Sequence, residues 1–457
     1  MVKIIDERPT KDPSDKPNPE HATFRAGDET SRRLQVIRIG LLGCGTVGGA
    51  VARRITKANK ALEGRGLRLE LVRSLVRDTK KARRDIPPSL QLTDDANLFL
   101  AERYDVVIEA LGGLDAPRAL INRLLAAGVP VVTANKEVVA AHGDGFAEAA
   151  RLGGTRIRFE AAAIPGVRFL ETIARPNVAG DVAEFAGVLN GTSQFILSSI
   201  ENDGLSFDAA LHRAVVLGLA EPDASRDLKG LDAADKLRLI LRELGLETAE
   251  AIAPATTAVD AITPQIVADA RRLAGRIRQV ALARNQGDTL EAYVGPAWVA
   301  EGHAFAKLAS VENSVTFRDA AGTRTQYVGA GAGPDVTAQA LLNDVVAIAT
   351  EPALIVETAH RNPLRRRVCA NIRTPWFVYA SFRRDATNPS RVSELLASAG
   401  VLFRRFESPP PAGGVERVVG ITFPQDASTV HEASKTIVDV AGGAVWAIPA
   451  IEDSTHG

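Results

Sequence analysis

Apolar runs alternate with amphipathic stretches over the first third of the chain. Apolar segments at 36–42, 69–76, 104–109 and 129–133 have the length of buried strands, and the stretch at 117–127 has helical spacing. Strands and helices in alternation form a parallel sheet that is covered on both faces. The pattern therefore predicts a doubly wound α/β sheet in this part of the chain.

The pattern then changes to longer helices. Helical stretches are predicted at 208–219, 231–244 and 264–283, and they indicate a second, mixed α+β domain at 161–324. A glycine-rich loop at 327–334 follows and precedes another helix. We expect this helix to return to the first domain, so that residues 325–355 complete the unit formed by 34–160.

The last part of the chain, 366–454, repeats neither pattern. Its predicted order is strand, helix, strand, strand, helix, strand, at 376–382, 389–399, 402–406, 415–423, 429–440 and 444–448. This βαββαβ order is ferredoxin-like. It predicts a separate C-terminal module of the kind that regulates many enzymes.

Composition narrows the choice of partners and compartment. The 457 residues contain 55 Lys+Arg and 55 Asp+Glu, so net charge implies neither a nucleic-acid nor a membrane partner. No run of about twenty apolar residues is present. Cys44 and Cys369 are too few and too far apart for a disulfide framework or a cysteine metal site, which favours a reducing cytoplasm. Residues 1–33 are rich in charge and proline, and we expect a disordered tail there.

A glycine loop follows the first predicted strand. In Gly43-x-Gly45-x-x-Gly48 the first glycine permits a tight turn, the second lets a pyrophosphate approach, and the third lets the helix pack closely. Strand before and helix after indicate a Rossmann-type dinucleotide site. The basic run at 77–84 after the second strand favours NADP over NAD, although such a run also occurs on solvated helix faces.

Five ordered segments carry a family resemblance: GLLGCGTVG at 40–48, VVTANK at 131–136, VLNGTSQFIL at 188–197, LGLAEPD at 217–223 and DLKGLDAADK at 227–236. From about residue 36 to 350 the chain closely resembles homoserine dehydrogenases, and 370–450 resemble the ACT module of some bacterial members. The resemblance implies NAD(P)-dependent interconversion of L-homoserine and L-aspartate 4-semialdehyde, in threonine, methionine and isoleucine biosynthesis. It also implies a catalytic and dimerisation domain in the middle, and a homodimer or homotetramer.

The resemblance also assigns roles to individual residues. Lys136 would line the junction of nicotinamide and substrate, Asp232 would bind substrate, and Lys236 would donate the proton. The expected substrate-binding residues are Glu221, Gly218, Thr192 and Asp227. The expected cofactor-binding residues are Gly43, Cys44, Gly45, Thr46, Val47, Gly48, Arg77, Gly112, Lys136, Gly331 and Gly333.

Elementary chemistry agrees with these roles. Reduction of an aldehyde needs hydride at carbon and a proton at the developing alkoxide, which a lysine ammonium can stabilise and protonate. The α-ammonium of the substrate needs a fixed carboxylate, for which Glu221 and Asp227 are candidates. Asp232 and Lys236 are four residues apart and share one helix face; without the other motifs, an ordinary surface ion pair would be the favoured interpretation.

Two segments depart from the family pattern. Members usually have a glycine-rich turn whose carbonyls hold a monovalent cation, but here Ile164 and Pro165 stiffen the backbone. A sodium site would use Glu160, Ala163, Pro165 and Val167. In the C-terminal module the turn at 384–390 lacks the glycine that follows proline in amino-acid-binding versions. An amino-acid effector and a purely assembling role are therefore equally open for this module.

Two other functions remain compatible with the sequence. Ile164, Pro165 and Arg168 lie near the expected pocket and leave room for a paralogous dehydrogenase of another amino-acid semialdehyde. A non-catalytic cofactor and amino-acid sensor is the other alternative. A sensor is disfavoured by the presence of four charged site residues that an inactive site would not need, Lys136, Glu221, Asp232 and Lys236.

Overall fold

A computed structural model describes residues 34–83, 86–174, 182–244, 246, 255–309, 311–350, 367–369, 371–411, 414–441 and 443–452. The predicted tail at 1–33 lies outside these residues. None of the described helices combines the length and the apolar character needed to cross a bilayer.

The first sheet has six parallel strands in the order β3-β2-β1-β4-β5-β6. The strands are β1 Gln35–Leu42, β2 Leu67–Leu75, β3 Gln91–Thr93, β4 Val106–Glu109, β5 Val131–Thr133 and β6 Ile157–Arg158. The accompanying helices are α1 Thr46–Leu62, η1 Glu63–Arg65, α2 Ala96–Leu100, α3 Asp115–Ala126 and α4 Lys136–Leu152. Strand order reverses between β1 and β4, and in doubly wound sheets the ligand binds at such a point, beyond the carboxyl ends of the strands.

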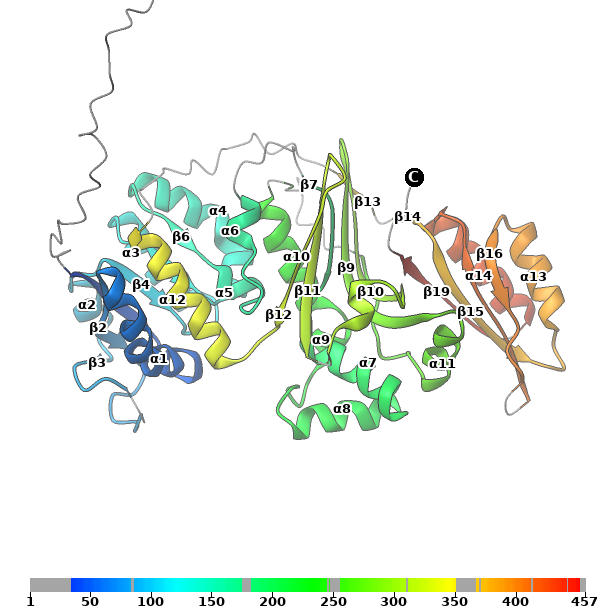
Figure 1. The fold of residues 1–457 in the computed structure, drawn as a ribbon, viewed down its shortest axis with the longest axis horizontal. Helices are drawn as coiled ribbons and strands as arrows, with labels where there is room; N and C mark the ends of the chain where they lie inside the picture. Colours follow the sequence, from blue (N-terminus) through cyan, green and yellow to red (C-terminus); the bar gives the residue numbers. More distant parts are fainter. Residues whose placement is uncertain are drawn as a thin grey trace, which may run out of the picture.

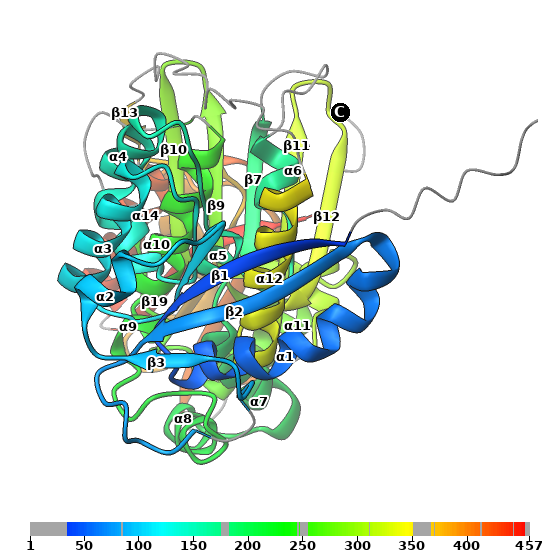
Figure 2. The ribbon, with the colours of Figure 1, turned by 90° about the vertical axis from the view of Figure 1, so that its left-hand side faces the viewer.

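The helix after the second glycine loop packs on this first sheet. Helix α12, Pro334–Thr350, lies beside α1 (Figures 1 and 2), and Ala338, Leu341 and Val345 share a core with α1. The strand before it, β12 Arg324–Ala330, pairs instead with β11 Glu312–Asp319 in the second sheet. The chain thus crosses between the two sheets at Gly331–Gly333.

The second sheet runs through the middle of the molecule and into the C-terminal module. Its order is β12-β11-β7-β9-β10-β19-β15-β17-β16, and β13 and β8 also pair with β10. The other strands of its middle part are β7 Val182–Val188, β8 Ala255–Thr256, β9 Gly275–Gln286, β10 Thr289–Ala300 and β13 Arg367–Cys369. The helices are α5 Glu160–Ala163, α6 Leu170–Ala174, α7 Gly191–Asp203, α8 Phe207–Val216, α9 Ser225–Leu228, α10 Leu231–Glu243, α11 Pro264–Arg272 and η2 Ala304–Lys307.

The predicted long helix at 264–283 is wrong in its second half. Helix α11 ends at Arg272, Ala274 has a positive φ of 57°, and β9 begins at Gly275. A Cβ at Gly275 would lie 2.0 Å from the Trp298 ring, which shows how closely β9 packs against β10. The run after Gly275 is buried almost throughout, so it has no alternation to mark it as a strand, and its pairing with β10 and β7 decides the conformation.

The C-terminal module has the predicted βαββαβ order. It consists of β15 Trp376–Arg383, α13 Pro389–Ser398, β16 Phe403–Glu407, β17 Val415–Thr422, α14 Ala427–Ala441 and β19 Ala444–Ile451, with a small β14–β18 pair at Arg373–Thr374 and Gln425–Asp426. Its strands are antiparallel in the order β19-β15-β17-β16, and β19 runs parallel to β10 (Figure 1). The module therefore extends the middle sheet.

Helix α10 joins the two halves of the catalytic part of the molecule. On one side Leu237 and Ile240 pack with sheet residues such as Val315, and on the other side Leu239 packs with Phe146 of α4. The helix is thus held between the second sheet and the helices of the first.

Candidate active site

The loop between β1 and α1 has the shape of a phosphate-binding turn. Gly43 has a φ of +93°, and a Cβ there would lie 2.7 Å from the carbonyl oxygen of Ala110. A Cβ at Gly48 would lie 1.9 Å from the carbonyl oxygen of Gly43, so both glycines are required by packing. At Gly45 nothing lies within 4 Å of the Cβ position. Its open backbone, directly before the N-terminus of α1, fits a dinucleotide pyrophosphate.

Basic residues lie beside this loop. Arg77 is exposed directly after β2, and the Nε of Arg83 donates to the carbonyl oxygen of Cys44 at 3.2 Å. The predicted basic run therefore folds back over the glycine loop, although Arg84 lies outside the described residues. Burial raises the pKa of the Cys44 thiol, which keeps it neutral.

The ends of β4 and β5 are tied together next to the loop. Thr133 donates to the buried carboxylate of Glu109 at 2.5 Å, and burial raises the pKa of Glu109. Asn135 caps the N-terminus of α4, and its amide donates to the carbonyl oxygen of Gly113 at 2.8 Å. The Gly112–Gly113 turn, with positive φ at both glycines and open space around them, is thereby fixed beside the first residue of α4, Lys136.

Asp232 brings the two predicted catalytic lysines together. The Nζ of Lys136, on α4, contacts Oδ1 of Asp232, and the Nζ of Lys236 lies 3.0 Å from Oδ2. Lys236 also donates to the carbonyl oxygen of Leu189 at 2.7 Å. The side chains of Asp232 and Lys236 are only 8% and 11% exposed, so this is not an ordinary surface ion pair. Residues of both domains meet here.

A second acid lies beside this cluster. Asn190 donates to Oδ1 of Asp227 at 2.7 Å and to Oδ2 of Asp232 at 2.9 Å. Burial alone would raise the pKa of Asp232, but the ammonium groups of Lys236 and Lys136 outweigh it and lower the pKa below its ordinary range. The pKa of Asp227 is raised, first by burial and then by the charge on Asp232.

The remaining predicted substrate residues lie where α7 begins and on the loop after α8. The hydroxyl of Thr192 donates to the carbonyl oxygen of Leu219 at 2.8 Å, and Gly218 has a φ of +71°. Glu221 follows on the same loop and is exposed. Among the described residues no hydrogen bond or ion pair joins Glu221 to the lysine cluster.

The second glycine loop approaches the same region. A Cβ at Gly331 would lie 2.3 Å from the side-chain oxygen of the buried Asn313, and Gly333 has a φ of +132° directly before α12. A side chain at position 331 would therefore displace the amide of Asn313. Its helix, α12, packs on α1 and brings the loop toward the first glycine turn.

The expected cation loop is folded tightly. Oε1 of Glu160 accepts from the N–H groups of Phe169 and Leu170 at 2.7 and 3.1 Å, and the N–H of Val167 donates to the carbonyl oxygen of Ile164 at 3.0 Å. Ala163 is the last residue of α5, and Pro165 follows in the turn. The part of the chain that the structure describes contains no group of three or more His, Cys, Asp or Glu that could hold a metal. The sodium site stays a prediction, because it would depend on carbonyl oxygens.

Comparison with known proteins identifies the family. Two family models match, homoserine dehydrogenase over 169–346 and homoserine dehydrogenase, NAD binding domain, over 43–160. A homoserine dehydrogenase of Helicobacter pylori is 32% identical over 335 residues, which cover 72% of this chain and 78% of that protein. The chain belongs to the homoserine dehydrogenase family. A homoserine dehydrogenase of Bacillus subtilis is 27% identical over 83% of this chain and 89% of its own length.

The fold agrees with this family. A solved homoserine dehydrogenase from Thiobacillus denitrificans matches with a TM-score of 0.79 at 27% identity, over 92% of this chain and 99% of that one. The predicted class, an NAD(P)-dependent oxidoreductase of the homoserine dehydrogenase type, is thereby confirmed. These matches favour neither the paralogous dehydrogenase nor the sensor. The segments matched by the two family models end at residue 346, before the C-terminal module, so its likeness to an ACT module stays a prediction.

One residue of the homoserine dehydrogenase site was not assigned a role from sequence. Asn190 caps α7 through its side-chain oxygen and uses its amide to hold both Asp227 and Asp232. The signal that was available is an asparagine directly before a helical run, which marks an N-cap. Its second role depends on α9 and α10 lying beside that cap.

Proposed function

We propose that this protein interconverts L-homoserine and L-aspartate 4-semialdehyde with NADP. In this proposal Lys236 donates the proton to the reacting oxygen in reduction and accepts it in oxidation. The observation that carries the proposal is the buried Asp232 carboxylate shared by Lys136 and Lys236. The ammonium of Lys236 has three N–H groups, and two of them point to Asp232 and Leu189. The third is thereby oriented, and it can donate to the aldehyde oxygen during reduction.

The other residues would bind and orient the substrate. When bound, the nicotinamide supplies the hydride for reduction or accepts it in oxidation. Lys136, at the start of α4 beside the Gly112–Gly113 turn, would lie between cofactor and substrate. Asp227 and Glu221 would hold the substrate ammonium, with Thr192 and Gly218 lining the pocket. The preference for NADP is supported by the positive charges of Arg77 and of Arg83, whose side chain donates to the Cys44 carbonyl of the glycine loop.

A homodimer or homotetramer in the cytoplasm, an amino-acid effector at the C-terminal module, and a sodium ion at the Glu160 loop complete the proposal. The loop at the expected effector site makes two local polar contacts. Asn388 caps α13, and the Asp385 carboxylate is paired with Arg383 at 2.6 Å. An amino-acid effector and a purely assembling role are therefore equally open for this module.

The test is homoserine oxidation followed by reduced-cofactor absorbance, with NAD and NADP in parallel. We expect the ratio of kcat/KM to favour NADP, and Lys236→Ala to lower turnover at least about a hundredfold, as is usual for a positioned general acid. Lys229→Ala removes an exposed lysine from the neighbouring turn and serves as the matched control. Turnover within a few-fold of wild type in Lys236→Ala would remove Lys236 from the mechanism.

A further inference from the structure

The two helices that carry the catalytic lysines are in contact along their length. Helix α4 begins at Lys136 and α10 carries Asp232 and Lys236. Leu239 of α10 packs into the same core as Phe146 of α4. The distance between these helices therefore sets how closely Lys136 approaches Asp232.

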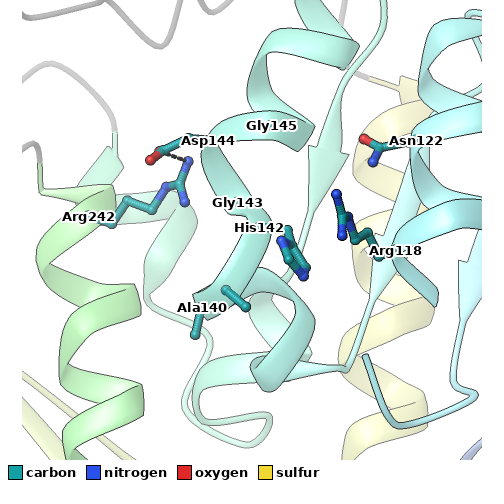
Figure 3. Close-up of a pocket in the computed structure, with 9 residues that line it drawn as sticks. Arg118, Asn122, Ala140, His142, Gly143, Asp144, Gly145 and Arg242 are labelled. Carbon is teal, nitrogen blue, oxygen red and sulfur yellow. Dashed lines mark ion pairs between the residues drawn. The ribbon is translucent and has the colours of Figure 1, made fainter. Parts of the chain in front are cut away.

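A charged contact joins the same two helices beyond the active site. Arg242 of α10 reaches across α4, and its NH2 lies 2.6 Å from the Asp144 carboxylate (Figure 3). The guanidinium occupies the space over Gly143, where a Cβ would lie 1.9 Å from its NH1. The contact borders a cavity of about 210 Å³ that Arg118 and His142 also line.

Gly143 is what lets the guanidinium lie this close to α4. Its φ is not positive, so its backbone conformation would accept any residue, and a helix interior ordinarily disfavours glycine. The backbone therefore does not require glycine at position 143, and the close approach of the Arg242 side chain does. From Lys136 to Gly143 the helix advances two turns, about 10 Å, so the contact lies well outside the reacting atoms.

We propose that Arg242, seated over Gly143 and paired with Asp144, is a positioning residue that fixes the spacing of α4 and α10 and thereby the approach of Lys136 to Asp232. This inference rests on the proposed function, because it assigns the contact to the same catalytic centre. The contact of Arg242 with Gly143 and Asp144 joins the nucleotide-binding half of the chain to the substrate-binding half. Asp144 is 86% exposed, so its charge contributes little, and the seat over Gly143 matters more.

Gly143→Ala separates positioning from stability. The atoms nearest the added methyl belong to the guanidinium of Arg242 and not to the backbone, so the methyl displaces Arg242 from its seat without a clash within the helix. Alanine also improves the helix, and we expect a melting temperature that is equal to or higher than that of wild type. We expect kcat for homoserine oxidation to fall about three- to tenfold, with KM for NADP unchanged because the glycine loop is untouched.

Two further variants and one control complete the experiment. Arg242→Met should lower kcat by a similar factor, and Asp144→Asn by about twofold, since that ion pair is exposed to solvent. Arg151→Met removes an arginine from the same helix that pairs, among the described residues, with Glu148 of α4, and it should leave kcat unchanged. The double variant Gly143→Ala/Arg242→Met should lose no more than either single change, because both remove one contact.

Three results would overturn the inference. One is kcat within about 1.5-fold of wild type in both Gly143→Ala and Arg242→Met. Another is a decrease in both kcat and melting temperature in Gly143→Ala, since that would indicate a general packing defect. The third is an equal loss in Arg151→Met. If the wild type itself does not oxidise homoserine, the proposed function fails and this inference fails with it, whereas an active wild type with unaffected variants overturns this inference alone.

Discussion

Replacing Asp232 by Asn removes one charge from the active site and keeps the shape of the side chain. In the wild type this carboxylate faces Lys136 on one oxygen, and Lys236 and Asn190 on the other. An asparagine presents an N–H₂ group to one of these donors. The variant therefore leaves two ammonium groups close together without the anion that separates them.

The expected effect on stability can be worked from this geometry. Two ammonium groups that contact one carboxylate are about 5 Å apart, and at an effective dielectric constant of about 20 they repel by about 3 kcal/mol. Removing one partner of a buried pair costs about 3–5 kcal/mol. The side chain of Lys136 is 29% exposed and can turn toward solvent, so we expect the lower end, about 3 kcal/mol. Turnover should fall at least about a hundredfold, because Lys236 loses its orientation.

Urea unfolding of wild type and Asp232→Asn at several pH values is the assay. The folded-state pKa of Asp232 is lowered, so its charge stabilises the fold fully above the unfolded pKa of about 4. That contribution is lost as pH falls through the folded pKa. The difference between the two proteins should therefore be constant from about pH 5 to 8 and shrink below pH 4. Equal stability at pH 7, or a difference that grows in acid, would refute the reasoning.

Two other substitutions test the substrate pocket and the contact between α11 and the C-terminal module. Asp227→Asn should raise the melting temperature at pH 7. The pKa of Asp227 is raised in the folded state, so ionisation of this carboxyl group destabilises the wild type at pH 7. Below about pH 4 the carboxyl group is protonated in both states, and the gain should vanish. The same variant should raise KM for homoserine about tenfold or more through the loss of a carboxylate for the substrate ammonium, and an unchanged KM would remove Asp227 from the pocket. Arg417→Met leaves Asp269 of α11 buried without its partner at 2.9 Å and should cost about 3 kcal/mol in thermal unfolding. Arg417→Met/Asp269→Leu should recover most of that loss, and failure to recover would show that the pair does not hold the C-terminal module.

Much of the fold follows from local pattern. The alternation up to residue 160 predicts the parallel sheet, because strand and helix periods differ along the chain itself. The C-terminal order is equally readable, since strands and the two helices α13 and α14 follow one another as separate local patterns. The helix expected at 264–283 fails for the opposite reason. From Gly275 onward the chain is buried on both sides, and its pairing with the adjacent β10 and with β7 from an earlier part of the chain makes it a strand.

The site divides in the same way. The glycine loop is recognisable from its spacing, whereas the roles of Lys136, Asp232 and Lys236 are expected from the resemblance of their motifs to homoserine dehydrogenases. Their convergence is a tertiary matter: α4 and α10 belong to different sheets and meet only when the two halves pack.

What the sequence by itself determined is therefore the inventory of this protein: its periodic elements, its glycine turns and its charged motifs, all of which depend on neighbours within a few residues. What only the tertiary structure decided is which charges share a burial site. Asn190 holds two acids from other helices, and Arg242 lies over a glycine of a helix about a hundred residues earlier in the chain. Long-range packing sets such contacts, because the free energy of a buried charge depends on the groups around it and not on its place in the chain.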